Sequence, residues 1–359
     1  MGISGREFLT AFALGFEVEC KIAEAIHPIH YMRGYHTTGT IGAFGAATAA
    51  GKILGLSEQK MRYALGIVAS MSAGIRSNFG TMTKALHAGR AAENGVVAAR
   101  LAELGFTSDP CILENPLGYF KILGGAFAAS DSHILENPLW GYSKTSGDGF
   151  DLDKISGKLG NPYAILYPGV SIKPYPSVVL SHPSMNALLD LEKEHDLKPE
   201  DVAEVYVYAG SNVVNILRAF PQSGLEGKFS LRFCLTSILL RRRANIADFS
   251  DEFVRSHEAQ EMMKRIRIFL DPEIEAKGYA QILGRIEVRL KDGRTVRRNF
   301  GPYKGGRENP LNEAELAEKV IACAECALPG EKIHQALDLL KRIEKLQNIR
   351  LLIPVLLPD

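Results

Sequence analysis

One histidine stands in a glycine-rich segment that leads into a predicted helix. His36 lies within Gly34–Thr40. The N-terminus of a helix attracts carboxylates through its free N–H groups and the helix dipole. A histidine at such a place can bind an anion or transfer a proton near neutral pH. The alternative is a loop at the start of a helix in which the histidine has no chemical role.

A lysine and a second histidine occur together near the start of another predicted helix. Lys84 and His87 are three residues apart, so they would share one face of the helix. Thr81 or Thr83 could cap that helix. A cation, a histidine and free N–H groups in one place suit a carboxylate ligand. The alternative is an ordinary solvated start of a helix.

Two further lysines stand next to sequence features that could fix their positions. Lys173 lies in Ser171–Ser177, where Pro174 and Pro176 keep the backbone extended and stiff. Such a segment would place a lysine well at a domain boundary, although a rigid linker with an exposed lysine is the alternative. Lys228 precedes a predicted helix and faces either a cleft or the solvent. The pair of residues 182 and 183, histidine and proline, is interpreted as the start of a helix.

Other kinds of catalytic site have no support in the sequence. The patterns HExxH, GxSxG and the P-loop are absent, and no spaced cluster of cysteine and histidine occurs. The sequence therefore predicts no metal site and no cofactor. Cys323 and Cys326 form a CxxC pair in an alanine-rich helical stretch without a preceding strand, so packed helical thiols are predicted instead of a redox centre.

Size and charge limit the classes of partner. A chain of 359 residues exceeds one compact core, which favours two domains. The net charge of +1 gives no broad basic field for nucleic acid. No stretch reaches the roughly 20 apolar residues that span a bilayer, and the N-terminus has no signal-peptide pattern. We predict a cytoplasmic protein with neither nucleic acid nor membrane as a partner.

Helical patterns dominate the first half of the chain. Ser4 and Glu7 form a capping box before apolar residues at helical spacing. Further helices are expected from about Thr40, from near Ser57, and from about Leu86 to Leu104, the last ended by Gly105. A stripe of small residues on the helix from about Thr40 (Gly42, Ala46 and Ala50) would let another helix approach closely. The segment Ile112–Tyr119 is nearly repeated at Ile134–Tyr142, which we interpret as a local duplication.

Strand patterns appear after Lys173. Val202–Tyr208 and Arg285–Leu290 alternate between apolar and polar residues, and Lys291–Arg294 predicts a hairpin turn before Thr295–Arg298. Helices are expected near Ser184–Glu194, Leu231–Arg243 and Asp251–Ile266, and Asn312 with Glu315 predicts another capped helix. The expected fold is mainly α with an α+β lid. It comprises a helical domain at 1–173, the lid at 174–303 and a C-terminal helical part at 304–359.

Five segments, taken in their order along the chain, resemble the MmgE/PrpD family of enzymes, which includes 2-methylcitrate dehydratase. They are Ala11–Val18, Gly34–Gly42, Lys84–Ala92, Ile172–Pro176 and Lys228–Ser230. The resemblance extends from about residue 4 to the C-terminal helix, and the combination of segments is specific. It implies a large helical domain with an inserted α+β lid, and it also implies a homodimer. It further implies metal-independent chemistry on a small polycarboxylate.

The resemblance also implies roles for particular residues. By similarity, His36, Lys84 and Lys173 match catalytic positions of the family, and His87, Lys228 and Tyr175 are candidates for substrate binding. In the family's reactions, negative charge develops next to a carboxylate, where lysines and helix N–H groups stabilise it. Our hypothesis is that Lys84 and Lys173 hold carboxylates while His36 acts as the general acid and base.

The resemblance leaves the reaction open. The first expectation is a hydro-lyase that abstracts an α-proton and eliminates water, as in 2-methylcitrate dehydration. A decarboxylase of the cis-aconitate type and an epimerase of the iminodisuccinate type are alternatives. Family members begin with a further helical region of roughly a hundred residues, a piece of domain size, and this chain begins after it. A non-catalytic or split-enzyme subunit is therefore the alternative from another class.

Overall fold

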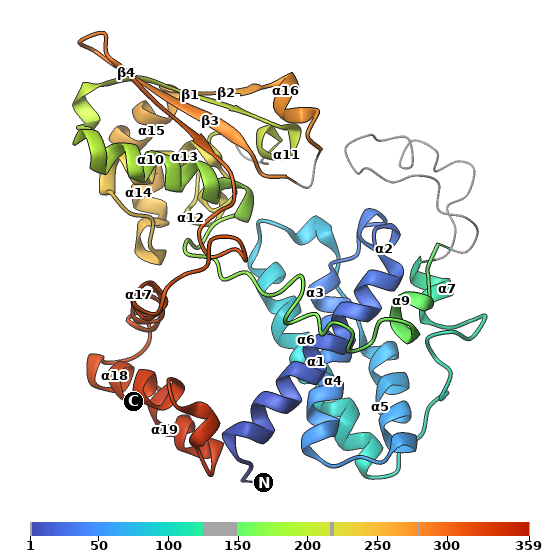
Figure 1. Ribbon diagram of the computed structural model, residues 1–359. Coiled ribbons are helices and arrows are strands. Elements are labelled where there is room, and N and C mark those ends of the chain that lie inside the picture. The colour runs from blue at the N-terminus through green and yellow to red at the C-terminus, as the bar shows by residue number, and fades with distance from the viewer. Residues whose placement is uncertain (1, 125–148, 216–218, 279–280, 359) are drawn as a thin grey trace. The chain divides into compact units, whose positions relative to one another are not determined.

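The computed structural model describes residues 2–124, 149–215, 219–278 and 281–358. Within these residues the chain forms two compact units (Figure 1). The first unit contains residues 2–124, 149–169 and 327–358, and the second contains 170–215, 219–278 and 281–326. The prediction of a mainly α protein with a small α+β part is confirmed. The domain boundaries expected from the sequence stay a prediction.

The first long helix begins at its predicted capping box. α1 spans Gly5–Ile26, with the Glu7 backbone N–H donating to Ser4 Oγ at 3.2 Å and the Ser4 N–H donating to Glu7 Oε2 at 2.7 Å. These two bonds satisfy donors that the first turn of a helix leaves unpaired. The helix ends before Pro28 because the preceding residue, His27, adopts extended backbone.

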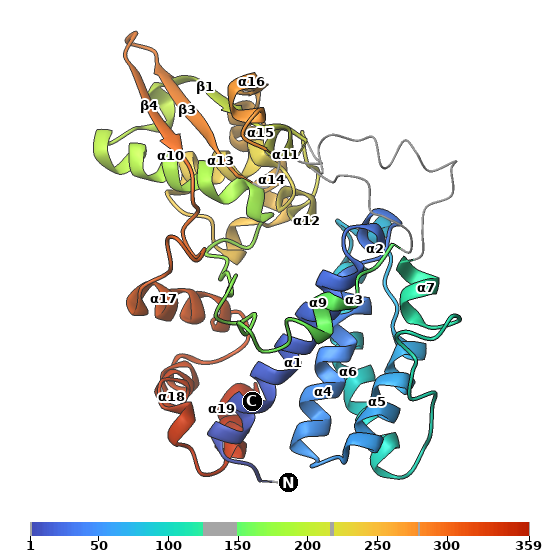
Figure 2. The same cartoon turned by 45° about the vertical axis from the view of Figure 1, so that its right-hand side comes forward.

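Three more helices pack with α1 to form the core of the first unit (Figure 2). They are α4 (Gly42–Ile53), α5 (Glu58–Met71) and α6 (Met82–Glu103). Ser57 caps α5 and Gly105 follows α6 with a positive φ, as predicted. α6 begins four residues earlier than about Leu86, because its N-cap is Thr81. The candidate residues Lys84 and His87 therefore lie inside the helix.

Helices α4 and α6 approach each other closely through small residues. A Cβ atom added to Gly95 of α6 would lie 2.4 Å from Ala46 Cβ and 2.5 Å from the backbone N of Ala47. The small-residue stripe predicted around Ala46 therefore does face another helix. Around this contact Ile22, Ile26 and Phe44 are buried almost completely.

Short helices complete the first unit. They are α2 (Ile29–Met32), α3 (Thr37–Thr40), η1 (Arg76–Asn78), α7 (Tyr119–Gly124), α9 (Asp153–Ser156), α18 (Gly330–Leu340), η7 (Ile343–Lys345), η8 (Ile349–Leu352) and α19 (Ile353–Leu356). The second copy of the sequence repeat, at 134–142, lies outside the described residues. No helix in the described parts of the chain combines the length and the apolar character needed to cross a bilayer. The cytoplasmic location stays a prediction.

A four-stranded sheet forms the centre of the second unit. Its order is β2-β1-β3-β4, with β1 (Val202–Ala209) parallel to β2 (Ile266–Leu270) and antiparallel to β3 (Gly284–Leu290), which pairs with β4 (Thr295–Phe300). The predicted hairpin between β3 and β4 is confirmed. β2 was missed, since the helical pattern was extended to Ile266. The sequence at 251–264 instead forms two helices, α14 (Asp251–Arg255) and α15 (His257–Lys264).

Helices cover one face of this sheet (Figure 1). The main ones are α10 (His182–His195) and α13 (Leu231–Arg241), whose apolar side chains pack against the inward residues of β1 and β3. α17 (Glu313–Ala324) begins with the predicted capping box of Asn312 and Glu315. The remaining elements are η4 (Val179–Ser181), η5 (Pro199–Asp201), α11 (Ser211–Val214), α12 (Gly224–Gly227), η6 (Ile246–Asp248) and α16 (Pro272–Glu275).

Candidate functional site

Two of the predicted residues, His36 and His87, contact each other in the first unit. Their Nδ1 atoms are 2.9 Å apart, and both side chains are buried. One Nδ1 must carry the hydrogen and the other must accept it. A Cβ atom added to Gly39 would lie 2.5 Å from the carbonyl oxygen of Ala73 and 3.2 Å from His87 Cβ. A glycine is therefore needed where the two segments that carry these histidines meet.

The backbone around His36 is held on both sides. Its N–H donates to the carbonyl of Gly74 at 3.0 Å, and its own carbonyl accepts the N–H groups of Gly39 and Thr40. Thr40 Oγ1 lies 2.8 Å from Nε2 of buried His30. The start of α3 thus fixes the backbone position of His36.

Lys84 lies close to the same histidine. Its Nζ is 5.1 Å from the centroid of the Phe79 ring, and Phe79 contacts His36 edge-to-face at 4.8 Å. Burial lowers the pKa of His36 to about 4, with further contributions from the positive charges of His87, Lys84 and Arg76. His36 is therefore neutral at neutral pH, in a place where nearby positive charges would attract an anion.

The second unit holds the other three predicted residues on two adjacent segments. The ammonium group of exposed Lys173 donates to the carbonyl of Ser177 at 3.5 Å. The next residue, Val178, donates its N–H to the carbonyl of Lys228 at 2.9 Å. This backbone pairing brings the segment of Lys228 beside the one that carries Lys173. The Lys228 side chain is half-buried.

Tyr175 is buried between polar and aromatic neighbours. Its hydroxyl accepts a hydrogen bond from Asn186 Nδ2 at 3.0 Å, and its ring packs edge-to-face on His182 at 5.3 Å. Burial raises the pKa of Tyr175, so the side chain keeps its proton. Tyr175 can therefore act as a hydrogen-bond donor to a ligand but not as a base at neutral pH.

His182 is a polar residue whose surroundings the sequence did not reveal. It starts α10, as predicted, and its Nε2 lies 3.3 Å from the Ser177 carbonyl that also accepts from Lys173. A carbonyl only accepts, so Nε2 carries the hydrogen. Burial and the neighbouring Lys173 lower the pKa of His182 to about 4. In the sequence, only the short spacing between residues 173 and 182 could have indicated that both side chains reach the Ser177 carbonyl.

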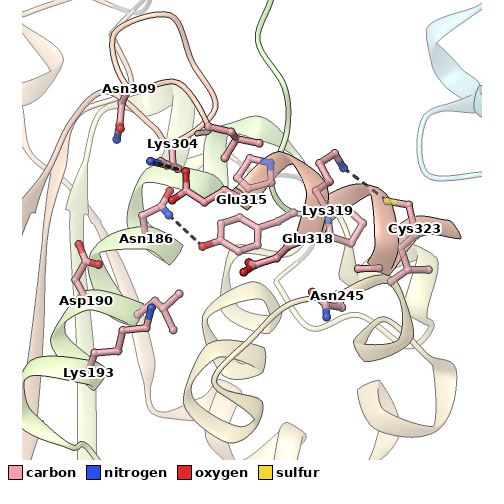
Figure 3. A pocket seen from close by; sticks show the side chains of 17 residues that line it. Asn186, Asp190, Lys193, Asn245, Lys304, Asn309, Glu315, Glu318, Lys319 and Cys323 are labelled. Carbon is pink, nitrogen blue, oxygen red and sulfur yellow. Dashed lines mark hydrogen bonds and ion pairs between the residues drawn. The ribbon is translucent and has the colours of Figure 1, made fainter. Parts of the chain in front are cut away.

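A cavity of about 540 Å³ opens in the second unit (Figure 3). Its wall comes from the segment after Lys173, from α10, from the loops at 245–246 and 304–311, and from α17. Of the predicted site residues, Tyr175 lines this cavity. Cys323 also lines it and is exposed, as is Cys326, so the prediction of packed thiols was wrong. The reason is that α17 has no buried residue.

The predicted residues thus form two groups, one in each unit. His36, Lys84 and His87 come together in the first unit, and Lys173, Tyr175 and Lys228 lie on neighbouring segments of the second. A single site that contains all six stays a prediction from similarity. Among the residues that the structure describes, no three His, Cys, Asp or Glu side chains gather as a metal site would require.

Buried neutral histidines make stability sensitive to acid. The pKa values of His30, His36 and His182 are each lowered to about 4, mainly by burial. An unfolded histidine takes up its proton near pH 6.5, so their stabilisation is complete above that pH and is lost toward pH 4. As the pH falls through this range, each of the three histidines should lower the free energy of unfolding by about 1.4 kcal/mol per pH unit. Burial raises the pKa of Glu19 to about 7. This shift increases the free energy of unfolding as the pH falls, but it comes from one group and opposes three histidines.

We therefore expect a lower free energy of unfolding at pH 5 than at pH 7, measured by urea denaturation. His182→Gln should make the unfolding free energy depend less steeply on pH, because about one proton fewer is taken up on unfolding. His195→Gln, at an exposed position in the same helix, is the matched control and should leave the dependence unchanged. An unfolding free energy that stays constant between the two pH values would contradict this account.

Sequence comparisons identify relatives over almost the whole chain. The profile of the MmgE/PrpD N-terminal domain matches residues 1–131, and that of the MmgE/PrpD C-terminal domain matches residues 175–344. Human cis-aconitate decarboxylase is 27% identical over 358 residues, which cover 98% of this chain and 69% of the human protein. The mouse cis-aconitate decarboxylase is 26% identical over 359 residues (97% and 68%), and that of Aspergillus terreus 24% over 374 (99% and 71%).

The order of the matching segments, the two domain profiles and the mainly helical fold with its small α+β part agree with one another. The resemblance inferred from the sequence is confirmed, and the chain belongs to the MmgE/PrpD family.

Proposed function

We propose that this protein is a lyase that acts on a small polycarboxylate by transferring a proton at a carbon next to a carboxylate. The observation that carries the proposal is the hydrogen-bonded pair of His36 and His87 beside Lys84. The named activity of the relatives, cis-aconitate decarboxylase, is also a lyase activity on a small tricarboxylate. The geometry and the relatives therefore support the same class of reaction.

Substrate binding would prepare His36 for proton transfer. Lys84 lies in the first turn of α6, where the helix N–H groups and dipole also favour a carboxylate. A carboxylate charge about 5 Å from His36 would be worth about 3 kcal/mol at an effective dielectric constant of about 20. That energy corresponds to about two pKa units. It would raise the pKa of His36 from about 4 toward the neutral range, where general acid–base catalysis is most effective.

Decarboxylation of a cis-aconitate-like substrate is the first candidate, because the relatives are named for it. Loss of carbon dioxide from the CH2 carbon would leave an electron pair that is delocalised through the double bond to the former vinyl CH carbon, next to a remaining carboxylate that Lys84 would stabilise. Protonated His36 would then donate its proton to that carbon. In this proposal lysine charges stabilise the developing negative charge, and no metal is required.

Dehydration of the 2-methylcitrate type is the second candidate. Elimination of water requires a base that removes the α-proton and an acid that protonates the leaving hydroxide. The histidine pair offers both kinds of group at Nε2, because the ring whose Nδ1 donates can accept at Nε2 and the ring whose Nδ1 accepts carries its hydrogen on Nε2. The substrate-binding roles of Lys173, Tyr175 and Lys228 stay predictions in either reaction.

Proton NMR in deuterated water tests the proposal directly. The protein would be incubated separately with cis-aconitate, 2-methylcitrate, citrate and iminodisuccinate. We expect consumption of cis-aconitate with one deuterium at its former vinyl CH carbon, or dehydration of 2-methylcitrate. Turnover of iminodisuccinate alone would favour an epimerase. If folded protein neither converts nor exchanges any of them, the proposal is wrong and the non-catalytic or split-enzyme alternative gains support.

We propose that the protein is a homodimer, because apolar side chains remain exposed on two long helices of the first unit. Phe12 is 51% exposed and lies beside exposed Phe8 and Leu9 on α1, and Val96 and Val97 are exposed on α6. Exposed apolar patches of this kind commonly mark protein interfaces. Light scattering coupled to size exclusion should give the mass of a dimer, and Leu9→Ser with Phe12→Ser should weaken it. A monomer at all concentrations would contradict the proposal.

A further inference from the structure

The cavity in the second unit carries positive charge that its own side chains do not neutralise. Lys304 pairs with Glu315 at 2.8 Å, and Asp190 pairs with Arg298 at 3.0 Å. Two other lining lysines, Lys193 and Lys319, form no ion pair with a carboxylate of the described residues. One lining carboxylate, Glu318, likewise has no cationic partner among the described residues. The two complete pairs cancel, which leaves two cations and one anion for a ligand.

Neutral hydrogen-bonding groups lie between these charges. The Tyr175 hydroxyl accepts from Asn186 Nδ2 and keeps its own proton for donation. Asn186 Oδ1 is buried and accepts no hydrogen bond from the described residues. A buried acceptor without a partner costs about 1–3 kcal/mol, so a ligand that donates to it would be favoured. Figure 3 shows Lys193 and Lys319 on opposite sides of the cavity, with Glu318 between them, and Tyr175 also lines the cavity.

We propose that this cavity binds a small dicarboxylate with a hydroxyl or ammonium group beside one carboxylate, such as malate or aspartate. One carboxylate would pair with Lys193 and the other with Lys319. The hydroxyl or ammonium group would donate to Glu318 or to Asn186 Oδ1. A volume of about 540 Å³ lies within the usual range for small-molecule sites, roughly 300–1,000 Å³. This inference uses only residues of the second unit and does not depend on the proposed function.

Cys323 offers a local readout of occupancy. Its thiol is exposed and lines the cavity, with Sγ 3.8 Å from Lys319 Nζ, whereas Cys326 is exposed but outside the lining. The alkylation rate of each cysteine would be measured by peptide mass spectrometry with iodoacetamide, a neutral reagent, at constant ionic strength. Malate or aspartate should slow alkylation of Cys323 severalfold and saturably, and should leave Cys326 unchanged. Succinate, which lacks the donor group, should require a higher concentration.

Substitutions on other elements separate binding from indirect effects. Lys193→Met lies on α10, away from the helix of Cys323, and should weaken the protection by about tenfold, the effect of losing about 1.4 kcal/mol. Glu318→Gln should reduce the preference for malate over succinate. Lys198→Met is the matched control, because the Lys198 side chain is 45% exposed, pairs with Asp196 and does not line the cavity. Lys84→Met, in the first unit, should keep full protection even if it abolishes turnover.

Three results would overturn the inference. The first is that neither malate nor aspartate at millimolar concentration slows alkylation of Cys323. The second is equal slowing at Cys326, which would indicate a general effect of anions. The third is protection that persists unchanged in a Lys193→Met protein whose circular dichroism shows a native fold. If Lys193→Met fails to fold, Glu318→Gln and the comparison with succinate still decide the matter.

Discussion

Replacement of His36 by asparagine is expected to abolish turnover while the protein stays folded. Asparagine can still form a hydrogen bond with Nδ1 of His87, which lies 2.9 Å from Nδ1 of His36. It cannot take up or release a proton near neutral pH. Because general acid–base catalysis typically contributes 10²–10⁴-fold, kcat should fall by roughly a thousandfold. The measurement is the NMR assay with whichever polycarboxylate the native protein converts.

A control at an exposed histidine makes this result specific. His195 lies at the C-terminal end of α10 and is exposed, so His195→Asn should retain full activity. The thermal midpoint of His36→Asn should lie only slightly below that of the native protein, because the substitution removes the ring contact with Phe79 but leaves a hydrogen-bonding side chain beside His87. Native-level turnover by His36→Asn would refute the role assigned to this histidine, and the acid–base group would then have to be sought elsewhere.

The substitution with the largest expected effect on stability is Gly95→Ala in α6. The added Cβ atom would lie 2.4 Å from Ala46 Cβ and 2.5 Å from the backbone N of Ala47. These are parts of a helix backbone and a short side chain that cannot rotate away, so α4 and α6 would have to separate. Such overpacking should lower the free energy of unfolding by about 3 kcal/mol, as measured by urea denaturation. Activity should fall too, because α6 carries Lys84 and His87.

Gly89→Ala is the matched control in the same helix. An added Cβ atom at this exposed glycine meets no heavy atom within 4 Å. The higher helix propensity of alanine should therefore raise the free energy of unfolding by about 0.5–1 kcal/mol. If Gly95→Ala were as stable as Gly89→Ala, the close packing of α4 on α6 would be wrong.

Features that depend on near neighbours in the chain were predictable from the sequence. The capping boxes at Ser4 and Asn312 form as expected, because each needs only residues up to three positions away. The alternation in Val202–Tyr208 and the hairpin at 291–294 identify β1, β3 and β4. The family was recognisable for a similar reason, since its segments keep their order and spacing.

Features that depend on distant partners were not predictable. β2 is a strand because its backbone pairs with β1, where Ile266 lies opposite Val205, and five residues carry too short a pattern to reveal this. The exposure of Cys323 and Cys326 follows from the position of α17, whose apolar residues find no core. The contact between His182 and the Ser177 carbonyl depends on a turn that no local rule specifies.

The amino-acid sequence by itself determined the helical first half, most of the sheet, the family and the segments in which the chemical groups lie. Those properties follow from bonds and periodicities within a few residues. Only the tertiary structure decided that His36 and His87, which are 51 residues apart, share a hydrogen bond, and that burial makes His36 neutral. It also decided that Lys193 of α10 and Lys319 of α17 line one cavity. Distances and pKa values of this kind depend on packing between elements, which short-range patterns do not encode.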